Sequence, residues 1–173
     1  MVQALTRPLP GGPVLDLASG PSGSALLAAA AGRRVTAVDV SDAALCLLAE
    51  EASHRGVRSL IALVHADLAA WRPRPGSYAD VLCTGYWDRD LCPAAADAVT
   101  AGGVLGWEAF TAAARRVRPN LRGAWLLGAG EPACLLPATF ETLSQQELPD
   151  DHAGAKRQLL ARRVPGLEAG SQS

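Results

Sequence analysis

An acid and a pair of glycines near the start of the chain have the spacing of a ligand-binding turn. In "VLDLASGPSG", an apolar run that begins at Val14 leads to Asp16, and Gly20 and Gly23 follow. Glycine lets the backbone come close to a ligand and lets the next helix begin with its amide groups exposed. Asp39 follows at about the spacing at which an acid accepts hydrogen bonds from ribose hydroxyls. These residues predict a site for a nucleoside.

The residues around Gly20 indicate which nucleoside this turn would bind. A glycine turn followed by an acid is shared by proteins that bind nicotinamide dinucleotides and proteins that bind adenosylmethionine. The dinucleotide fingerprint G-x-G-x-x-G is absent, because Pro21 and Ser22 follow Gly20. Asp16 would repel a diphosphate, whereas its carboxylate could stabilise the ammonium group of a methionine moiety. The stretch therefore favours a cationic ligand.

Apolar, β-branched runs alternate with helix-forming runs over most of the chain. Near-continuous apolar strands that alternate with helices indicate a parallel sheet covered on both faces. The fold class is therefore predicted as α/β, Rossmann-like and doubly wound, with a mostly parallel seven-stranded sheet, an antiparallel C-terminal strand and helices on both faces. The first five predicted strands cover 14–17, 34–41, 60–67, 78–85 and 103–110, and the predicted helices cover 24–32, 42–56 and 90–103.

The C-terminal part of the chain predicts two further strands, "TFETLSQQEL" at 139–148 and "KRQLLARRV" at 156–164. The polar link between them is shorter than the dozen or so residues that a parallel crossover needs, so we expect them to be antiparallel. Segment 111–127 has few periodic signals and several arginines, and it is predicted to be a mobile loop.

The composition limits the possible partners and the location. The length suits a single domain at 1–173, with its core at 13–164 and a flexible tail at 165–173. The net charge of −1 and the 5% aromatic content predict no nucleic-acid partner. No segment is long and apolar enough to span a membrane, which predicts a soluble, cytoplasmic protein. The cysteines lack C-x-x-C spacing and predict no metal site; they are Cys46, Cys83, Cys92 and Cys134.

Four stretches resemble the motifs of class I S-adenosylmethionine-dependent methyltransferases. "VLDLASGPSG" is similar to their first motif, "RVTAVDVS" to their acidic second strand, "HADLAAW" to their adenine-contacting turn and "YADVLCTGYWDRDL" to their fourth-strand motif. The chain also looks like a subgroup of small methyltransferases related to the tellurite-resistance type, in which "DRDL" precedes a helix and "GG" precedes the fifth strand. The similarity covers roughly residues 13 to 164. It implies an enzyme with S-adenosylmethionine as its cofactor.

The resemblance implies cofactor contacts at successive strand ends. The first turn would hold the methionine end, Asp39 the ribose and Val40 the adenine ring. Asp67 and Leu68 would contact the adenine amine and ring edge, and Cys83 or its carbonyl would lie near the methionine ammonium. As an alternative, Asp39 and Asp67 could each cap the helix or turn that follows. The full implied set is Asp16, Ala18, Ser19, Gly20, Gly23, Asp39, Val40, Asp67, Leu68 and Cys83.

The chain departs from the family pattern in two places. Ala18 and Ser22 occupy positions where the family usually has glycine, which would reduce cofactor affinity. The helical cap that the family commonly carries is missing ahead of Pro13. We therefore expect the substrate side to be open or to be completed by another subunit, in a protein that is a monomer or a homodimer.

Methyl transfer from a sulfonium is an in-line displacement, for which the protein must align the acceptor and exclude water. Tyr86, Trp87 and Glu108 follow or end the fourth and fifth strands and are predicted to line the catalytic pocket. Asp88 and Arg89 are predicted to form a surface ion pair. The loop at 111–122 is expected to order over the acceptor unless a second subunit covers it.

Three functions remain open from the sequence. The first is a methyltransferase that acts on a small molecule, because the nucleic-acid signature Asn-Pro-Pro-aromatic is absent after the fourth strand. The second is a protein that binds the cofactor without catalysis. The third, a nicotinamide oxidoreductase, would use a Tyr-x-x-x-Lys pair, and Lys156 has no tyrosine four residues before it.

Overall fold

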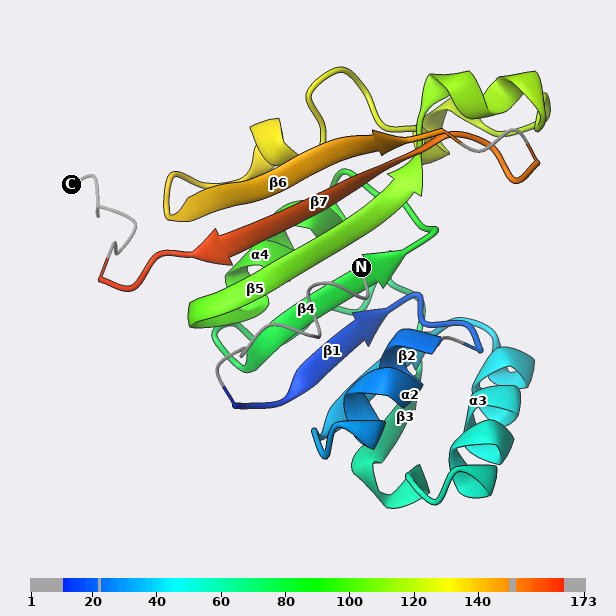
Figure 1. The fold of residues 1–173 in the computed structure, drawn as a ribbon, viewed down its shortest axis with the longest axis vertical. Coiled ribbons are helices and arrows are strands. Elements are labelled where there is room, and N and C mark those ends of the chain that lie inside the picture. Colours follow the sequence, from blue (N-terminus) through cyan, green and yellow to red (C-terminus); the bar gives the residue numbers. More distant parts are fainter. Residues whose placement is uncertain (1–10, 22, 150–151, 167–173) are drawn as a thin grey trace.

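The computed structural model describes residues 11–21, 23–149 and 152–166. These residues form a seven-stranded sheet with the order β3-β2-β1-β4-β5-β7-β6, as Figure 1 shows. The expectations for Ser22 and for the segment ahead of residue 11 lie outside the described residues. The predicted α/β fold, with antiparallel pairing at the C-terminal strand, is confirmed. The strands are β1 (Val14–Leu17), β2 (Val35–Asp39), β3 (Ile61–His65), β4 (Tyr78–Thr84), β5 (Val99–Phe110), β6 (Phe140–Leu148) and β7 (Lys156–Arg163).

The first half of the sheet is built from two crossovers that wind in one direction. Helix α2 (Gly23–Ala30) joins β1 to β2, and helix α3 (Asp42–His54) joins β2 to β3. Right-handed crossovers that step along the sheet in one direction place their helices on the same face. A buried apolar cluster that includes Val14, Leu26 and Leu48 fills the space between these helices and the sheet.

The winding reverses after β3, so helix α4 (Leu91–Ala98) lies on the opposite face, as Figure 1 shows. A second buried cluster lies on that face and contains Leu105, Trp107 and Leu159 from β5 and β7. Trp87 also belongs to it, and its ring meets that of Trp107 edge-on at 5.4 Å between centroids. The two clusters confirm the expected helices on both faces.

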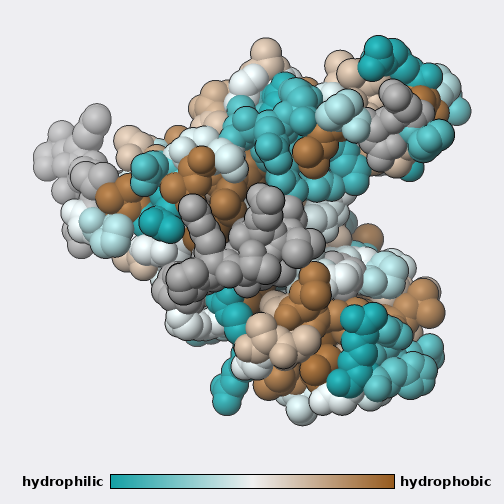
Figure 2. Space-filling model, in the orientation of Figure 1, coloured by the Kyte–Doolittle hydropathy of each residue, from teal (hydrophilic) through white to brown (hydrophobic). Residues whose placement is uncertain are grey.

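The exposed part of the sheet is polar where no helix covers it. On the face opposite Trp107, Glu108 of β5 accepts hydrogen bonds from Lys156 and Gln158 of β7. Figure 2 shows hydrophilic residues gathered over the β6 and β7 region. No helix in the described part of the chain is long and apolar enough to cross a membrane.

The start of β5 differs from the expected boundary. The helix predicted for 90–103 ends at Ala98, and β5 begins directly at Val99. Its pairing with β4 shifts between Tyr78 and Asp80, so extra residues bulge out of β5. Gly102 has a φ of +78°, and a Cβ on Gly103 would lie 2.5 Å from the Ala79 carbonyl oxygen. The glycine pair therefore allows a bulge inside the strand and does not mark the end of a helix.

Segment 111–127 is also more regular than expected. It contains two 3-10 helices, Ala112–Arg116 and Gly123–Trp125, and Thr111 forms a bridge with Leu127. The Thr111 amide donates to the Ala155 carbonyl at 3.0 Å, which fastens the segment to the sheet. Its mobility remains a prediction.

We predict that Gly103→Ala lowers the free energy of unfolding by about 1 to 3 kcal/mol, because the added methyl group must displace backbone atoms. Urea unfolding measures the change. Gly11→Ala is the matched control, because a Cβ there would meet nothing within 4 Å. Equal stability of both variants would show that the bulge is not tightly packed.

Candidate functional site

The carboxyl ends of β1, β2 and β4 meet at one edge of the sheet. Leu17 is in register with Val38 on β2 and with Cys83 on β4. The turns that follow these strands are therefore neighbours, as expected for the ligand edge of an open parallel sheet. The structure thus brings the first turn, Asp39 and Cys83 together.

Asp16 lies one residue before the end of β1 and is fully buried. Burial raises the pKa of the Cys83 thiol well above its usual range, and the nearby Asp16 carboxylate raises it further. The Cys83 thiol donates to the Tyr86 carbonyl at 3.6 Å. Cys83 is therefore a neutral side chain next to an acid at the base of the site.

The turn after β1 adopts left-handed backbone conformations at two positions. Gly20 has a φ of +53°, and Ala18 has a φ of +49°. An alanine in this region costs about 1 to 2 kcal/mol relative to an ordinary conformation. This strain gives a physical reason why glycine suits the position that Ala18 occupies. The Ser19 amide donates to the Val38 carbonyl at 3.0 Å and ties the turn to β2.

Asp39 connects this turn to the next helix. Its carboxylate accepts hydrogen bonds from the Gly20 amide at 2.7 Å and the Ser41 amide at 2.8 Å. The N-cap of α3 is Ser41, whose side chain accepts from the Ala44 amide. Asp39 thus positions the turn after β1 and does not cap α3 itself. A carboxylate has about four lone-pair sites, so two bonds leave capacity for ribose hydroxyls.

The residues implied in adenine binding surround the ends of β2 and β3. Val40 is 64% exposed, and its carbonyl accepts a hydrogen bond from His65 Nε2 at 3.0 Å. Asp67 is exposed and accepts from the Ala69 amide at 2.8 Å, so it does cap the turn that follows. Leu68 is buried beneath that turn. The adenine contacts of these residues remain predictions.

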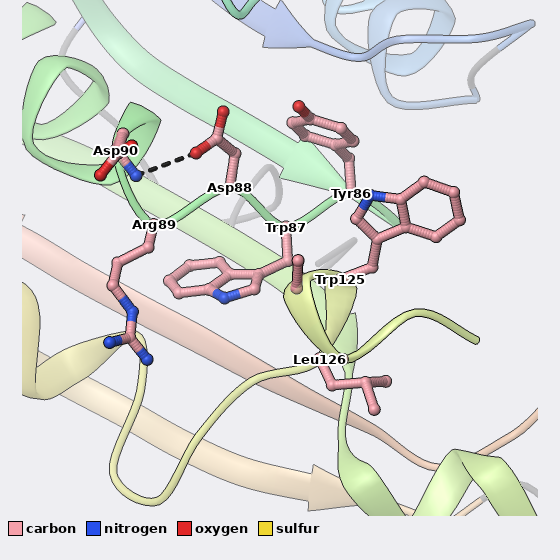
Figure 3. A pocket seen from close by; sticks show the side chains of 9 residues that line it. Tyr86, Trp87, Asp88, Arg89, Asp90, Trp125 and Leu126 are labelled. Carbon is pink, nitrogen blue, oxygen red and sulfur yellow. Dashed lines mark hydrogen bonds between the residues drawn. The ribbon is translucent and has the colours of Figure 1, made fainter.

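A cavity of about 470 Å³ lies beyond the end of β4, as Figure 3 shows. Tyr86 and Trp87 line it, as expected for the pocket. Trp87 is buried against Trp107, whereas Tyr86 is only partly buried. Burial and the neighbouring Asp88 raise the pKa of Tyr86, so its hydroxyl stays protonated at neutral pH. The full lining is Tyr86, Trp87, Asp88, Arg89, Asp90, Gly123, Ala124, Trp125 and Leu126.

Glu108 is placed away from this cavity, although the sequence predicts it in the catalytic pocket. It alternates with Trp107 along β5 and so points to the other face of the sheet. Its carboxylate accepts from Lys156 Nζ at 2.9 Å and from Gln158 Nε2 at 3.2 Å. Its catalytic role remains a prediction that this geometry does not favour.

The far wall of the cavity is segment 123–126, which sequence reasoning did not identify, and 111–122 is not part of the lining. Arg89 forms its ion pair with the buried carboxylate of Glu131 and not with Asp88. Glu131 also accepts from the Gly128 amide at 2.7 Å. Arg157 on β7 donates to the carbonyls of Gly128 and Glu131 at 2.7 and 2.8 Å.

These contacts fasten residues 128 to 131, which directly follow the wall, to strand β7 and to the segment after β4. Residues 128, 131 and 157 carry no local motif, and only their contacts in the fold reveal their role. No group of three or more potential metal ligands occurs within the described ranges.

A family model for a methyltransferase domain matches residues 14–103. The match covers more than half of the chain, and the chain belongs to this family. No curated protein sequence matches it significantly.

Solved structures with the same fold cover nearly the whole chain. One is the [4+2]-cyclase SpnF, with 16% identity, a TM-score of 0.74, and coverage of 95% of this chain and 80% of that one. A second is a structure solved in connection with the conversion of a disulfide bond into a thioacetal group during echinomycin biosynthesis. It has 19% identity and a TM-score of 0.70, with coverage of 97% of this chain and 82% of that one.

A third is the geranyl diphosphate C-methyltransferase from Streptomyces coelicolor A3(2), solved with Mg²⁺, geranyl diphosphate and S-adenosylhomocysteine. It shares 15% identity and a TM-score of 0.69, with coverage of 94% of this chain and 78% of that one. At these identities the likeness shows the fold.

The turn after β1 fits S-adenosylmethionine, which is the cofactor of this methyltransferase. A Cβ on Gly20 or Gly23 would meet nothing within 4 Å, so the backbone leaves open space for a ligand. Ser19 is buried, and its hydroxyl has no hydrogen-bond partner among the residues that the structure describes. A buried polar group without a partner is uncommon in folded proteins, and a ligand would satisfy this one.

We predict that Ser19→Ala weakens S-adenosylhomocysteine binding by about 0.5 to 1.5 kcal/mol, the usual value of one hydrogen bond. The stability of the free protein should stay the same, because the change removes no hydrogen bond between described residues. Calorimetric titration and urea unfolding measure the two quantities. Ser53→Ala, on the exposed side of α3, is the control, and unchanged affinity in Ser19→Ala would exclude this contact.

We also predict that Cys46 and Cys134 react with Ellman's reagent at pH 8, whereas Cys83 and Cys92 react only after denaturation. The first two are exposed and the second two are buried. Burial also raises the pKa of Cys92 to about 12, so its thiol stays protonated. Mass spectrometry of the labelled peptides locates the reaction. Rapid labelling of Cys83 would show that the end of β4 is open to solvent.

Proposed function

We propose that the protein transfers a methyl group from S-adenosylmethionine to a small-molecule acceptor. The observation that carries this proposal is the cavity of about 470 Å³, which lies beyond β4, the neighbour of the strand that carries Asp16. Its volume lies in the range of small-molecule sites, roughly 300 to 1,000 Å³. The neighbour that acts on geranyl diphosphate also supports a small acceptor.

The residues of the first three strand ends would hold the cofactor. Asp16 and the turn at 18–20 would bind its methionine end, with the Ser19 hydroxyl as a donor. Asp39 would accept hydrogen bonds from the ribose. Val40 and Leu68 would pack against the adenine, and Asp67 would contact its amine. The exposure of Val40 supports this role, since a ligand would cover an apolar side chain that the fold leaves open.

When bound, the cofactor supplies an activated methyl group on a sulfonium. The chain must then hold the acceptor in line and keep water away. Trp87 lines one side of the cavity, and the buried ring of Trp107 packs behind it. Tyr86 stays protonated and can donate a hydrogen bond, whereas the Asp88 carboxylate can accept a proton or a hydrogen bond from the acceptor.

The subgroup, the location and the assembly are also part of the proposal. The "DRDL" segment, which leads into α4, supports the tellurite-resistance type. The free cysteines support a cytoplasmic protein. A monomer or homodimer is proposed, without a nucleic-acid or membrane partner.

Calorimetric titration with S-adenosylmethionine, S-adenosylhomocysteine, NAD and NADP tests the cofactor. We expect binding of both sulfur nucleosides and no binding of the nicotinamide dinucleotides, because the acid before the turn opposes a diphosphate. Tight NAD binding together with no response to the sulfur nucleosides would reject the proposal.

Release of S-adenosylhomocysteine over thiols, phenols, amines and metalloid oxyanions tests catalysis. We expect turnover with at least one class. Cofactor binding without turnover of any acceptor would favour the second function, a cofactor-binding protein without catalysis.

A further inference from the structure

We propose that the cavity beyond β4 recognises an acceptor that carries a cationic amine next to an aromatic or apolar body. The inference rests on the proposed function, because it treats this cavity as the acceptor site. It follows from the charges, the aromatic rings and the fixed geometry of the lining, which are considered in turn.

The charge of the lining is acidic. Asp88 and Asp90 contribute two carboxylates, and Arg89 is the one cation among the lining residues. The Arg89 guanidinium is paired with Glu131, whose side chain is only 5% exposed and adds a further negative charge. The N-terminus of α4 contributes roughly half a positive charge, which two carboxylates outweigh. Arg122 is not a lining residue, but its guanidinium lies over the Trp125 ring. The negative charge is therefore concentrated at the end of the cavity that Asp88 and Asp90 line. That end would attract a cation and repel a carboxylate or a diphosphate.

Asp88 is held in place and is not a freely solvated surface acid. One of its oxygens accepts from the Asp90 amide at 2.9 Å, as the dashed line in Figure 3 shows. Its carboxylate also lies close enough to Tyr86 to raise the pKa of that hydroxyl. Asp90 occupies the N-cap position of α4, yet its side chain makes no capping hydrogen bond. Both carboxylates can thus bind an ammonium group without first breaking a helix cap.

The aromatic residues of the lining suit the rest of such a ligand. Trp125 is 46% exposed, so part of its ring is open to a ligand in the cavity. The Arg122 guanidinium lies over the Trp125 ring, 5.2 Å from its centroid. The Arg122 cation therefore already makes a cation–π contact with this ring. An amine ligand would make the same kind of contact and compete with Arg122.

Three indole probes with the same two-carbon arm test the proposal: tryptamine, tryptophol and indole-3-propionate. They differ only in an ammonium, a hydroxyl or a carboxylate at the end of the arm. Calorimetric titration of the protein saturated with S-adenosylhomocysteine should give tryptamine affinity at least about tenfold above tryptophol, with indole-3-propionate weakest. Equal or tighter binding of either competitor, or no binding of any probe, would overturn the proposal.

Variants separate charge recognition from folding. Asp88→Asn and Asp90→Asn should each weaken tryptamine binding about three- to tenfold and leave tryptophol unchanged. Asp97→Asn, at the exposed far end of α4, removes the same charge outside the cavity and should change neither affinity. Arg122→Gln should strengthen tryptamine binding by about two- to threefold, because the competing cation is gone. Equal loss of tryptophol binding in the aspartate variants, or weaker tryptamine binding in Arg122→Gln, would contradict the proposed contacts.

The cofactor titration keeps this inference separate from the proposed function. If S-adenosylhomocysteine does not bind, the proposed function fails, and the same three probes are titrated into the unloaded protein. If S-adenosylhomocysteine binds and tryptamine shows no preference, the proposed function stands and the amine inference is wrong.

Discussion

The pair of hydrogen bonds that the Asp39 carboxylate accepts is the interaction on which the turn after β1 and the start of α3 depend. One oxygen holds the amide of Gly20 and the other holds the amide of Ser41. A single side chain at the end of β2 thus fixes the turn after β1 and the start of α3 at once. The turn can keep its left-handed positions because this anchor and the sheet hold both of its ends.

The arrangement of the turn after β1 and of Asp39 could be predicted from the sequence, because these residues are close together along the chain. Their contacts with a cofactor remain predictions. The turn needs glycine at a left-handed position and an acid that accepts from its amide, and a short sequence motif is enough to indicate both. The antiparallel pairing of the last two strands also follows from the short link between them, whereas no local pattern indicates that β7 lies between β5 and β6. The alternative role of Asp67 as a turn cap is seen in the structure, and it does not exclude contact with a ligand through the second oxygen.

The cavity beyond β4 could not be predicted to the same degree, because long-range contacts define its lining. Glu108 is in the expected strand, but strand alternation turns it to the opposite face from Trp107. Trp125 belongs to a segment without periodicity, and nothing near it in the sequence indicates that it faces the end of β4. The predicted start of β5 is wrong because two adjacent glycines, Gly102 and Gly103, have the sequence pattern of a helix end, whereas in the structure they form a bulge inside the strand.

The attachment of the cavity wall to Arg157 has a consequence for how the protein is made. Strands β1 and β2, which hold the turn after β1, are complete within the first third of the chain, whereas Arg157 lies on the last strand, β7. During synthesis from the N-terminus, β7 must leave the ribosome and insert between β5 and β6 before Arg157 can reach the Gly128 carbonyl. A nascent chain would thus assemble the strands around the turn after β1 early and complete the wall of the cavity beyond β4 last.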